Sequence, residues 1–317
     1  MADINKLVER LYASIGEVCI VAPDVAHIEI HGNQVAGVHS VPGLNVDANR
    51  QGEILEVMMH LEAGVKIDRP VRLCFGILDP TGRQRIRMHA ALEEDSRVAL
   101  LGFCTFPNAR NIVHEMEADI SVGRKARYAY YERHVHGNTG GVKVIPRTQI
   151  VLHEDASFHT DFEVIKGRAG TIDLEYEAHC KARSILTMSS RISGRENDRI
   201  KIHEKAYLEG DNSRGTLRTT VAAIQHANAD ILNTLIASAP NARGHVDCKE
   251  IIKDQAVVRA VPVVEVRDPQ AHVTHEAALG SVDSKQLQTL MARGLSEEAA
   301  TDLIIEGLLR PAYRPGQ

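Results

Sequence analysis

Apolar and polar residues alternate through much of the middle of the chain, from about residue 140 to residue 275. The clearest run is residues 171–182, TIDLEYEAHCKA, in which every second position is apolar or small. Because successive side chains of a β-strand point to opposite faces, this pattern predicts a strand with one buried face. The predicted buried face consists of Ile172, Leu174, Tyr176, Ala178, Cys180 and Ala182.

Short segments rich in Gly, Asn, Asp and Pro separate these runs, mostly about 12 to 16 residues apart. They fall near residues 166, 193, 209, 226, 240, 253 and 267. Many short strands at even spacing are typical of a solenoid or a sandwich. The Asn-Gly and Asp-Gly pairs that two-residue hairpins favour are absent from this region. We therefore predict a mainly β protein with a parallel β-helix core, and a β-sandwich is the alternative.

Helical patterns lie at the two ends of the chain. Residues 3–15 place Ile4, Leu7, Val8, Leu11 and Ile15 at helical spacing, and Gly16 follows as a C-cap. Strand-like and ambiguous segments alternate from there to about residue 130. We expect a helical and mixed region over residues 1–130, a β-helix core over 131–280 and a helical region over 281–317.

The C-terminal region predicts two short amphipathic helices. Asp283 followed by Gln286 resembles a capping box, Ser296 begins the second helix, and Pro311 stops it. Two such helices are too small to form a core, so they must pack on the β domain or dock on a partner. Their apolar stripes consist of Leu287, Leu290 and Met291 in the first, and Ala299, Leu303, Ile304 and Leu308 in the second.

Composition excludes several functional classes. The net charge of −5 in 317 residues gives no basic footprint for nucleic acid or for an anionic membrane. The chain shows no signal peptide and no apolar run of membrane-spanning length, so we expect a cytoplasmic protein. The glycines at 137–141 lack the Lys-Ser/Thr of a phosphate loop, and no nucleophile elbow occurs.

The cysteines indicate a reducing compartment. There are five, an odd number, with no Cys-x-x-Cys pair, which argues against a disulfide framework or a zinc finger. Their positions are Cys19, Cys74, Cys104, Cys180 and Cys248.

One set of residues has the chemistry of an iron site. Cys248, His275 and Glu276 offer a thiolate, an imidazole and a carboxylate, which together suit iron or an iron–sulfur cluster. The alternative is that Cys248 is a small buried hydrophobe and the His-Glu pair is a solvated strand end. Adjacent residues on one strand point to opposite faces, so His275 and Glu276 could not meet one ion from within a flat strand.

Two further candidates favour structural roles. His134 and His136 share one face if extended, a spacing that cupin-like metal sites use, but no Glu follows at cupin spacing. Cys180 lies an even number of residues from Leu174 and Tyr176 and so shares their strand face, which predicts a packing role inside the β domain.

The tail, residues 273–309, resembles the SufB/SufD family of iron–sulfur cluster assembly proteins. The same resemblance includes NARGHVDC at 241–248 and LEGDNSRG at 208–215, and it covers roughly residues 130–310. It implies a right-handed parallel β-helix flanked by helical regions, and dimerisation through the β-helix. It also implies that the C-terminal helices dock onto SufC, an ABC-type ATPase that would supply ATP and Mg²⁺ chemistry in trans.

The resemblance assigns a role to the candidate site. It implies that Cys248, His275 and Glu276 hold a transient iron–sulfur cluster at the dimer interface, for transfer to apo acceptor proteins. A glutamate follows the histidine here, which points to a short SufB-like scaffold that is not itself an enzyme. His153 stands where SufB carries a sulfur-acceptor cysteine, so sulfide could be used directly, and His153 and Cys180 are second-tier candidates.

Alternatives to a homodimeric scaffold are a structural SufD-like subunit, paired with a paralogue, and a solenoid enzyme acting on polysaccharide. Aromatic residues make up 4% of the chain and Trp is absent, which disfavours the sugar platforms of such an enzyme.

Overall fold

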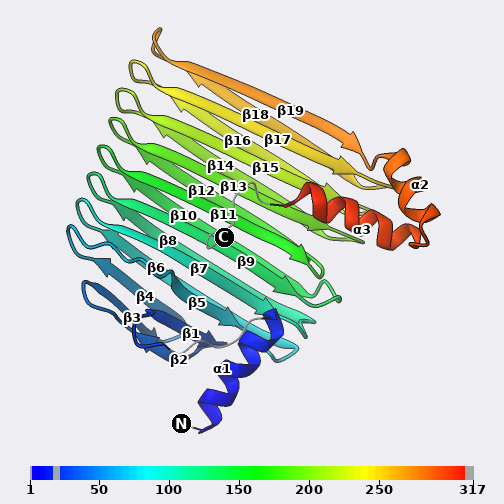
Figure 1. Ribbon diagram of the computed structural model, residues 1–317, viewed down its shortest axis with the longest axis horizontal. Coiled ribbons are helices and arrows are strands. Elements are labelled where there is room, and N and C mark those ends of the chain that lie inside the picture. Colours follow the sequence, from blue (N-terminus) through cyan, green and yellow to red (C-terminus); the bar gives the residue numbers. More distant parts are fainter. Residues whose placement is uncertain (1, 17–21, 311–317) are drawn as a thin grey trace.

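The computed structural model describes residues 2–16 and 22–310, with side chains from residue 6. Cys19 and Pro311 lie outside the described residues. The chain forms a β-solenoid of two long sheets, with one helix at its start and two at its end (Figure 1). The fold predicted from the alternating pattern is confirmed, and the sandwich alternative is wrong, because the successive coils pair in parallel.

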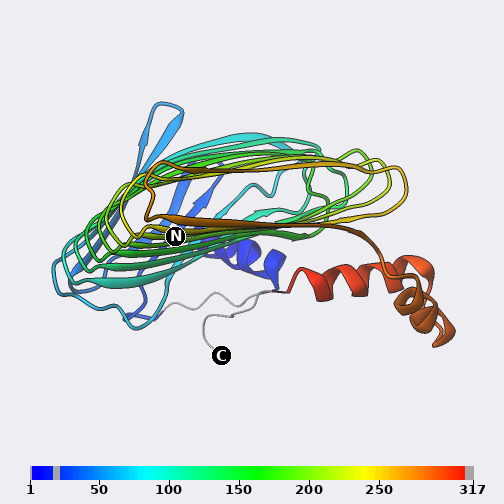
Figure 2. The same ribbon diagram turned by 90° about the horizontal axis from the view of Figure 1, so that it is seen from above.

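The two sheets run the length of the solenoid and form the long sides of each flattened coil (Figure 2). Sheet A contains β19 (His272–Ser281), β17 (Arg243–Ile252), β15 (Arg214–Ala223), β13 (Ile185–Gly194), β11 (Ser157–Lys166), β9 (Arg127–His136), β7 (Arg97–Phe106), β5 (Val71–Gly76), β1 (His27–His31) and β2 (Gln34–His39), in that order. Sheet B contains β18 (Val257–Val266), β16 (Asn228–Ala237), β14 (Arg199–Leu208), β12 (Thr171–Cys180), β10 (Val142–Leu152), β8 (Asn111–Val122), β6 (Thr81–Leu92), β4 (Ile54–Leu61) and β3 (Leu44–Gln51).

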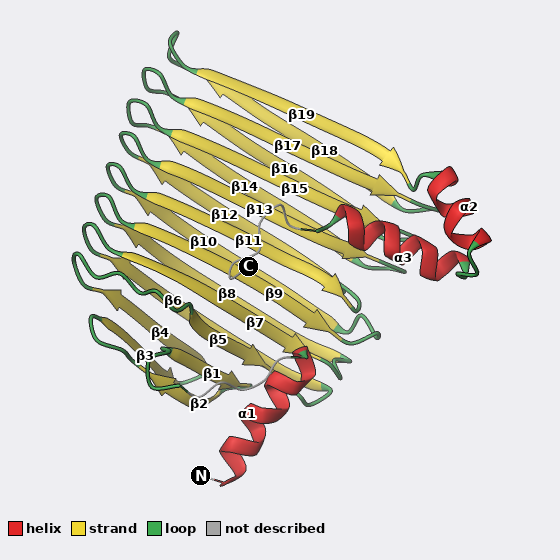
Figure 3. Cartoon of the chain, viewed as in Figure 1, coloured by secondary structure: helices red, strands yellow, loops and turns green. Residues whose placement is uncertain are grey.

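The solenoid begins well before residue 131. Parallel pairing already joins β1 to β5 and β4 to β6, and only β2 and β3 are antiparallel, closing the N-terminal end (Figure 3). Residue 131 lies inside β9, in the middle of sheet A. The mixed N-terminal region that the sequence indicated is therefore mostly the first coils of the same solenoid.

Alternating side chains build one continuous core between the sheets. In β12 the buried positions are Ile172, Leu174, Tyr176, Ala178 and Cys180, as the sequence predicts. Equivalent strands repeat after 28 to 30 residues, so each coil stacks its apolar residues on those of the coil before. Removing this surface from water is the main term that stabilises the fold.

The predicted turn segments connect the sheets. At each tight turn from sheet B to sheet A between β4 and β17, one residue adopts a left-handed backbone conformation, for example Asp155 (φ 59°) and Asn212 (φ 58°). The amide of Asp155 donates to the Ala182 carbonyl in the next turn, and the amide of Asn212 donates to that of Pro240. Asp and Asn tolerate this conformation better than most residues do, which is why they mark the turns in the sequence.

The first helix confirms the N-terminal prediction. Helix α1 (Ala2–Ile15) contacts β2, β5 and β7 and buries Leu11 and Tyr12. Gly16 follows in a left-handed conformation (φ 75°), and its amide donates to the Ala13 carbonyl. Helix α1 therefore covers the outer face of sheet A near its beginning.

Both C-terminal helices begin at the predicted caps. Asp283 accepts a hydrogen bond from the Gln286 amide before α2 (Ser284–Ala292), and Ser296 accepts one from the Ala299 amide before α3 (Glu297–Leu308). Helix α3 turns back along the outer face of sheet A (Figure 2). No helix in the described part of the chain reaches the length and apolarity that crossing a membrane requires.

The predicted stripe of α3 is rotated from the observed one. The buried residues of α3 are Ala300, Thr301, Ile304 and Ile305, whereas Ala299, Leu303 and Leu308 are exposed. Two ion pairs accompany this packing, Arg195 to Asp302 (2.7 Å) and Lys253 to Glu297 (2.8 Å). The helix thus turns a different face to the sheet from the one its hydrophobicity alone suggests.

Candidate functional site

The three candidate ligands lie at the C-terminal end of the solenoid. Cys248 is in β17 and is fully buried, whereas His275 and Glu276 are exposed on β19, the last strand of sheet A. Strands β17 and β19 pair in parallel, so the thiol lies one strand in from the open edge.

The register decides which of these side chains share a face. His275 pairs with Val246, and Glu276 pairs with Asp247. In-register partners in a sheet point to the same side, and Val246 and Cys248 both point inward. His275 therefore lies on the interior face with Cys248, and Glu276 lies on the outer face.

A run of polar residues leads along the interior to Cys248. In sheet A, Ser190, Thr219 and Cys248 are successive register partners on β13, β15 and β17. Facing them in sheet B are Glu204 on β14 and Asn233 on β16, which are also register partners. All five side chains are buried.

Hydrogen bonds connect the two sides of this polar run. Ser190 Oγ donates to Glu204 Oε1 (2.6 Å), and Asn233 Nδ2 donates to Thr219 Oγ1 (2.7 Å). The same amide nitrogen lies 3.6 Å from Cys248 Sγ. Among the described residues, Glu204 Oε2 and Asn233 Oδ1 have no hydrogen-bond partner, so the interior retains unused acceptors.

Burial shifts the protonation of these groups. It raises the pKa of Glu204 to about 7 and that of Glu250, next to Cys248 on β17, also to about 7. Burial, and then the negative charges of Glu250 and Glu204, raise the pKa of the Cys248 thiol to about 12. The cysteine is therefore a thiol near neutral pH unless a cation replaces its proton.

The last coil exposes an unusual amount of apolar surface. Strands β18 and β19 end their sheets and leave one backbone edge of each unpaired. Such an edge is a ready template for pairing with another chain. The exposed apolar residues on these two strands are Val257, Val261, Val263, Val266 and Leu279.

Comparison with known proteins identifies the family. A family model described as the SufBD core domain of SUF system FeS cluster assembly matches residues 81–308. An iron–sulfur cluster assembly SufBD family protein of Methanocaldococcus jannaschii is 34% identical over 282 residues, 89% of each chain. This chain belongs to the SufBD family. A SufBD family protein of Pyrococcus horikoshii is 35% identical over 285 residues, 90% of this chain and 87% of that one.

The resemblance seen in the tail segment is thereby confirmed. SufB of Bacillus subtilis is 24% identical over 262 residues, which are 80% of this chain and 55% of that protein. The SufBD core match begins at residue 81, in β6, earlier than the sequence motifs suggested.

Other residues singled out from the sequence lie away from Cys248. Cys180 is fully buried in β12, as its parity predicts, and burial raises the pKa of its thiol to about 12. His153 lies in the turn after β10, with Nε2 3.4 Å from Ser121 Oγ. His134 and His136 do share one face, which is the buried face of β9.

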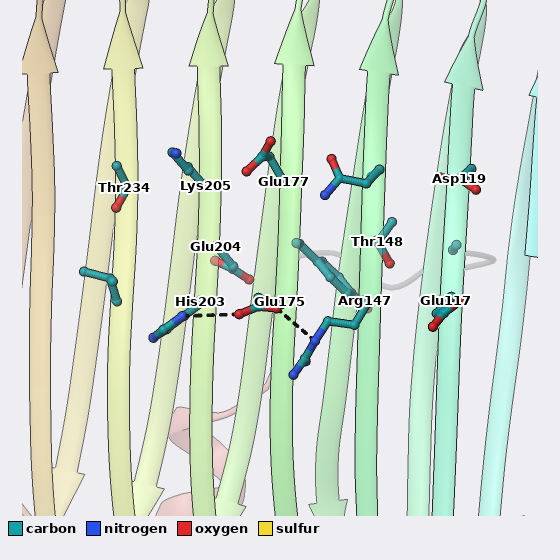
Figure 4. A pocket seen from close by; sticks show the side chains of 14 residues that line it. Glu117, Asp119, Arg147, Thr148, Glu175, Glu177, His203, Glu204, Lys205 and Thr234 are labelled. Carbon is teal, nitrogen blue, oxygen red and sulfur yellow. Dashed lines mark ion pairs between the residues drawn. The ribbon is translucent and has the colours of Figure 1, made fainter. Parts of the chain in front are cut away.

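A depression on the outer face of sheet B is lined by paired charges (Figure 4). Arg147 Nε lies 2.9 Å from Glu175 Oε2, and His203 Nδ1 lies 3.7 Å from the other oxygen of that carboxylate. Cys248, His275 and Glu276 are not among the residues that line it.

The predicted partner-binding residues divide into two groups. Met291, Leu303 and Leu308 are exposed, and Leu287 and Leu290 are half-buried. Ile304 is different, because it packs on the outer face of sheet A with Ala222 and Ile251. It is therefore used within the chain and is not available to a partner.

Glu204 and Asn233 are functional candidates that were not predicted from the sequence. Both are polar residues at positions where the alternation of their strands calls for an apolar side chain, as in Ile200, Ile202, Glu204, Ala206 and Leu208. That break in the pattern was the available signal.

Proposed function

We propose that this SufBD protein is a SufB-like scaffold that builds a labile iron–sulfur cluster where two copies of the chain meet. Each copy contributes Cys248, His275 and Glu276. The observation that carries the proposal is that Cys248 and His275 share the interior face of sheet A, with His275 on its unpaired edge strand and Cys248 on the adjacent strand.

A two-fold interface supplies what one chain lacks. In an isologous dimer the same edge of both copies meets, so ligands on both faces of β19 gather around one axis. The exposed apolar residues of β18 and β19 provide surface for such a contact. Glu276, on the outer face in one copy, then faces the site from the interface side.

The ligand set suits a cluster that must be released. Iron displaces the proton of the Cys248 thiol, and the Asn233 amide, 3.6 Å from the sulfur, stabilises the resulting negative charge. Imidazole and carboxylate are harder ligands than thiolate and hold iron in a cluster less tightly. Mixed ligation therefore favours transfer to apo acceptor proteins over permanent storage.

A SufC-type ABC ATPase is the proposed energy source. The chain itself has no phosphate loop, so ATP and Mg²⁺ would bind to the partner. Met291, Leu303 and Leu308 present exposed apolar surface on α2, which follows β19, and on α3, which packs on sheet A, so that an ATPase docked there could move the interface. The free thiols of Cys104, Cys180 and Cys248 suit the reducing cytoplasm.

The decisive experiment is anaerobic reconstitution with iron and sulfide in the presence of the ATPase. Cys248→Ala should abolish the charge-transfer absorbance from bridging sulfide to iron, which a single iron bound by a thiolate cannot give. The matched control is Cys180→Ala, which removes an equally buried thiol and should leave the absorbance unchanged. Full absorbance in Cys248→Ala would refute the assignment.

A structural SufD-like role is the second candidate. The complete burial of Cys248 within one chain favours it, because a buried thiol is poorly placed to receive iron. Native mass distinguishes the two functions: the scaffold forms a homodimer with two ATPase subunits, whereas the structural subunit pairs with a paralogue.

A further inference from the structure

A second cluster of potential metal ligands lies inside the solenoid, far from Cys248. The inward face of β9 reads Tyr128, Tyr130, Glu132, His134 and His136, and all five residues are buried. Strands β9 and β17 are four positions apart in sheet A, which is roughly 19 Å at the usual strand spacing. The two sites are therefore separate.

Neighbouring strands add two more side chains to this cluster. Cys104 comes from β7 and His114 from β8 in the opposite sheet, and both are buried. Cys104 Sγ lies 3.8 Å from Glu132 Oε1 and 3.8 Å from His114 Nε2. His134 Nε2 lies 2.8 Å from the same Glu132 oxygen.

These distances are close to those of a metal site. One ligand atom each from Cys104, Glu132 and His134 lie within 4.8 Å of one another. Metal–ligand bonds of about 2.0–2.3 Å in a tetrahedron place the ligand atoms roughly 3.3–3.7 Å apart. Small side-chain rotations would therefore bring these three ligand atoms within bonding distance of one ion.

The hydrogen bonds made by His134 and His136 require a positive charge beside them. The Arg168 carbonyl can only accept, so His136 Nδ1, 2.9 Å away, donates to it. Neutral His136 then accepts at Nε2 from His134 Nδ1, 3.3 Å away. His134 Nε2 is left with a lone pair that faces the Glu132 carboxylate.

Two acceptors 2.8 Å apart require a cation between or beside them, either a proton or a metal ion.

His114 is the buried member of the cluster that comes from the opposite sheet. It is 1% exposed, and its Nδ1 has no hydrogen-bond partner among the described residues. Leaving a buried polar nitrogen unsatisfied costs about 1–3 kcal/mol. The other ring nitrogen, Nε2, faces the cluster and lies 3.8 Å from Cys104 Sγ.

The surroundings favour a permanently bound ion. The Phe106 ring lies 5.2 Å from His114, and the Phe162 ring lies 4.8 Å from His134. A thiolate and a carboxylate together balance the charge of a dication, so the loaded site would be neutral in this apolar interior. Closed four-coordinate sites of this kind are structural ones.

We propose that Cys104, His114, Glu132 and His134 bind one divalent first-row metal ion of the Zn²⁺ or Fe²⁺ class, with His136 as a positioning residue for His134. Binding releases two protons to solvent, the thiol proton of Cys104 and the proton shared by Glu132 and His134. The ion would tie β7, β8 and β9 together across the interior and thereby connect the two sheets.

Cobalt(II) is a suitable probe, since its thiolate complexes absorb strongly and tetrahedral coordination has a distinct spectrum. The full chain carrying Cys248→Ala, which removes the other candidate thiol site, is refolded anaerobically with Co²⁺. We expect one bound Co²⁺ per chain, a thiolate-to-cobalt charge-transfer band and a raised melting temperature. A folded chain that retains no cobalt would overturn the proposal.

Two substitutions in that background identify the ligands. Cys104→Ser should remove the charge-transfer band, and Cys180→Ser, an equally buried cysteine, should leave it unchanged. A band of full intensity in Cys104→Ser would also overturn the proposal.

Further variants cover the case in which Cys104→Ser does not fold. Glu132→Gln preserves shape and should lower cobalt affinity. His136→Gln, acting only through His134, should lower it about 10- to 100-fold while the band keeps its shape. Unchanged affinity in both would contradict the assigned ligand set.

Discussion

His275 lies on the same interior face of sheet A as Cys248, on the neighbouring strand and in register with Val246, two residues before the cysteine. Glu276 is in register with Asp247 and points the other way. In one chain, the thiol and the imidazole thus lie on the interior face of sheet A, and the carboxylate lies on its outer face. A shared site of all three ligand types therefore requires a second copy.

His275→Ala should lower iron retention after reconstitution by about tenfold or more. The substitution removes a direct iron ligand, and even the loss of a residue that only supports a ligand lowers metal affinity about 10- to 100-fold. The control is His272→Ala, an exposed histidine on the same strand whose side chain has the opposite parity. Iron and sulfide analysis after gel filtration gives the result. Equal losses in both variants would mean that β19 contributes only structure.

Leu279→Arg should convert the proposed dimer into a monomer. Leu279 is 67% exposed on the edge strand β19, so a charge there costs the single chain little but opposes close contact between two apolar edges. Ile185→Arg is the control, because Ile185 is 47% exposed in β13, far from the edge. Native mass spectrometry should give half the mass for Leu279→Arg only; a dimer that persists would place the interface elsewhere.

The strands of the later coils could be predicted because apolar and polar residues alternate regularly along them. In β12 all apolar residues lie on one face, and Asp or Asn marks the turns that need a left-handed residue. In β4 this signal fails, since Met58 is 49% exposed while Met59 is buried. Apolar residues on both faces hide the alternation, so the first coils could not be recognised.

Contacts between distant parts of the chain determine features that the local sequence pattern does not reveal. The face of α3 that packs on sheet A meets Ala222 and Ile251, and Arg195 pairs with Asp302 from more than a hundred residues away. The polar interior was equally hidden. Glu132 looks like an ordinary charged residue until its parity with Tyr128 and Tyr130 is noticed.

Glu204→Gln should stabilise the chain above neutral pH and flatten its pH dependence. The folded state holds the proton of Glu204 more tightly, raising its pKa from 4.5 to about 7 through burial. Its contribution is therefore complete below about pH 4.5 and is lost as the pH rises through 7. The full effect is about 3 kcal/mol for a fully buried group.

Denaturant midpoints between pH 5 and pH 8 measure this effect. The exposed Glu62→Gln, which removes a charge without changing the interior, should keep the wild-type slope. A Glu204→Gln variant with that same slope would mean that water or another group keeps the carboxylate charged in the folded chain.

The double substitution Leu303→Asp and Leu308→Asp should abolish binding of the SufC-type ATPase without unfolding the chain. Both side chains are about half exposed on α3, so they contribute little to the fold but would lie at the centre of a docked interface. Val38→Asp, at the opposite end of the solenoid, is the control.

Ile304→Ala should behave differently, lowering stability by about 2–5 kcal/mol because its buried side chain packs on sheet A. Isothermal titration with the ATPase, alongside thermal melts, separates the two effects; undiminished affinity in the double variant would mean that the partner docks on another surface.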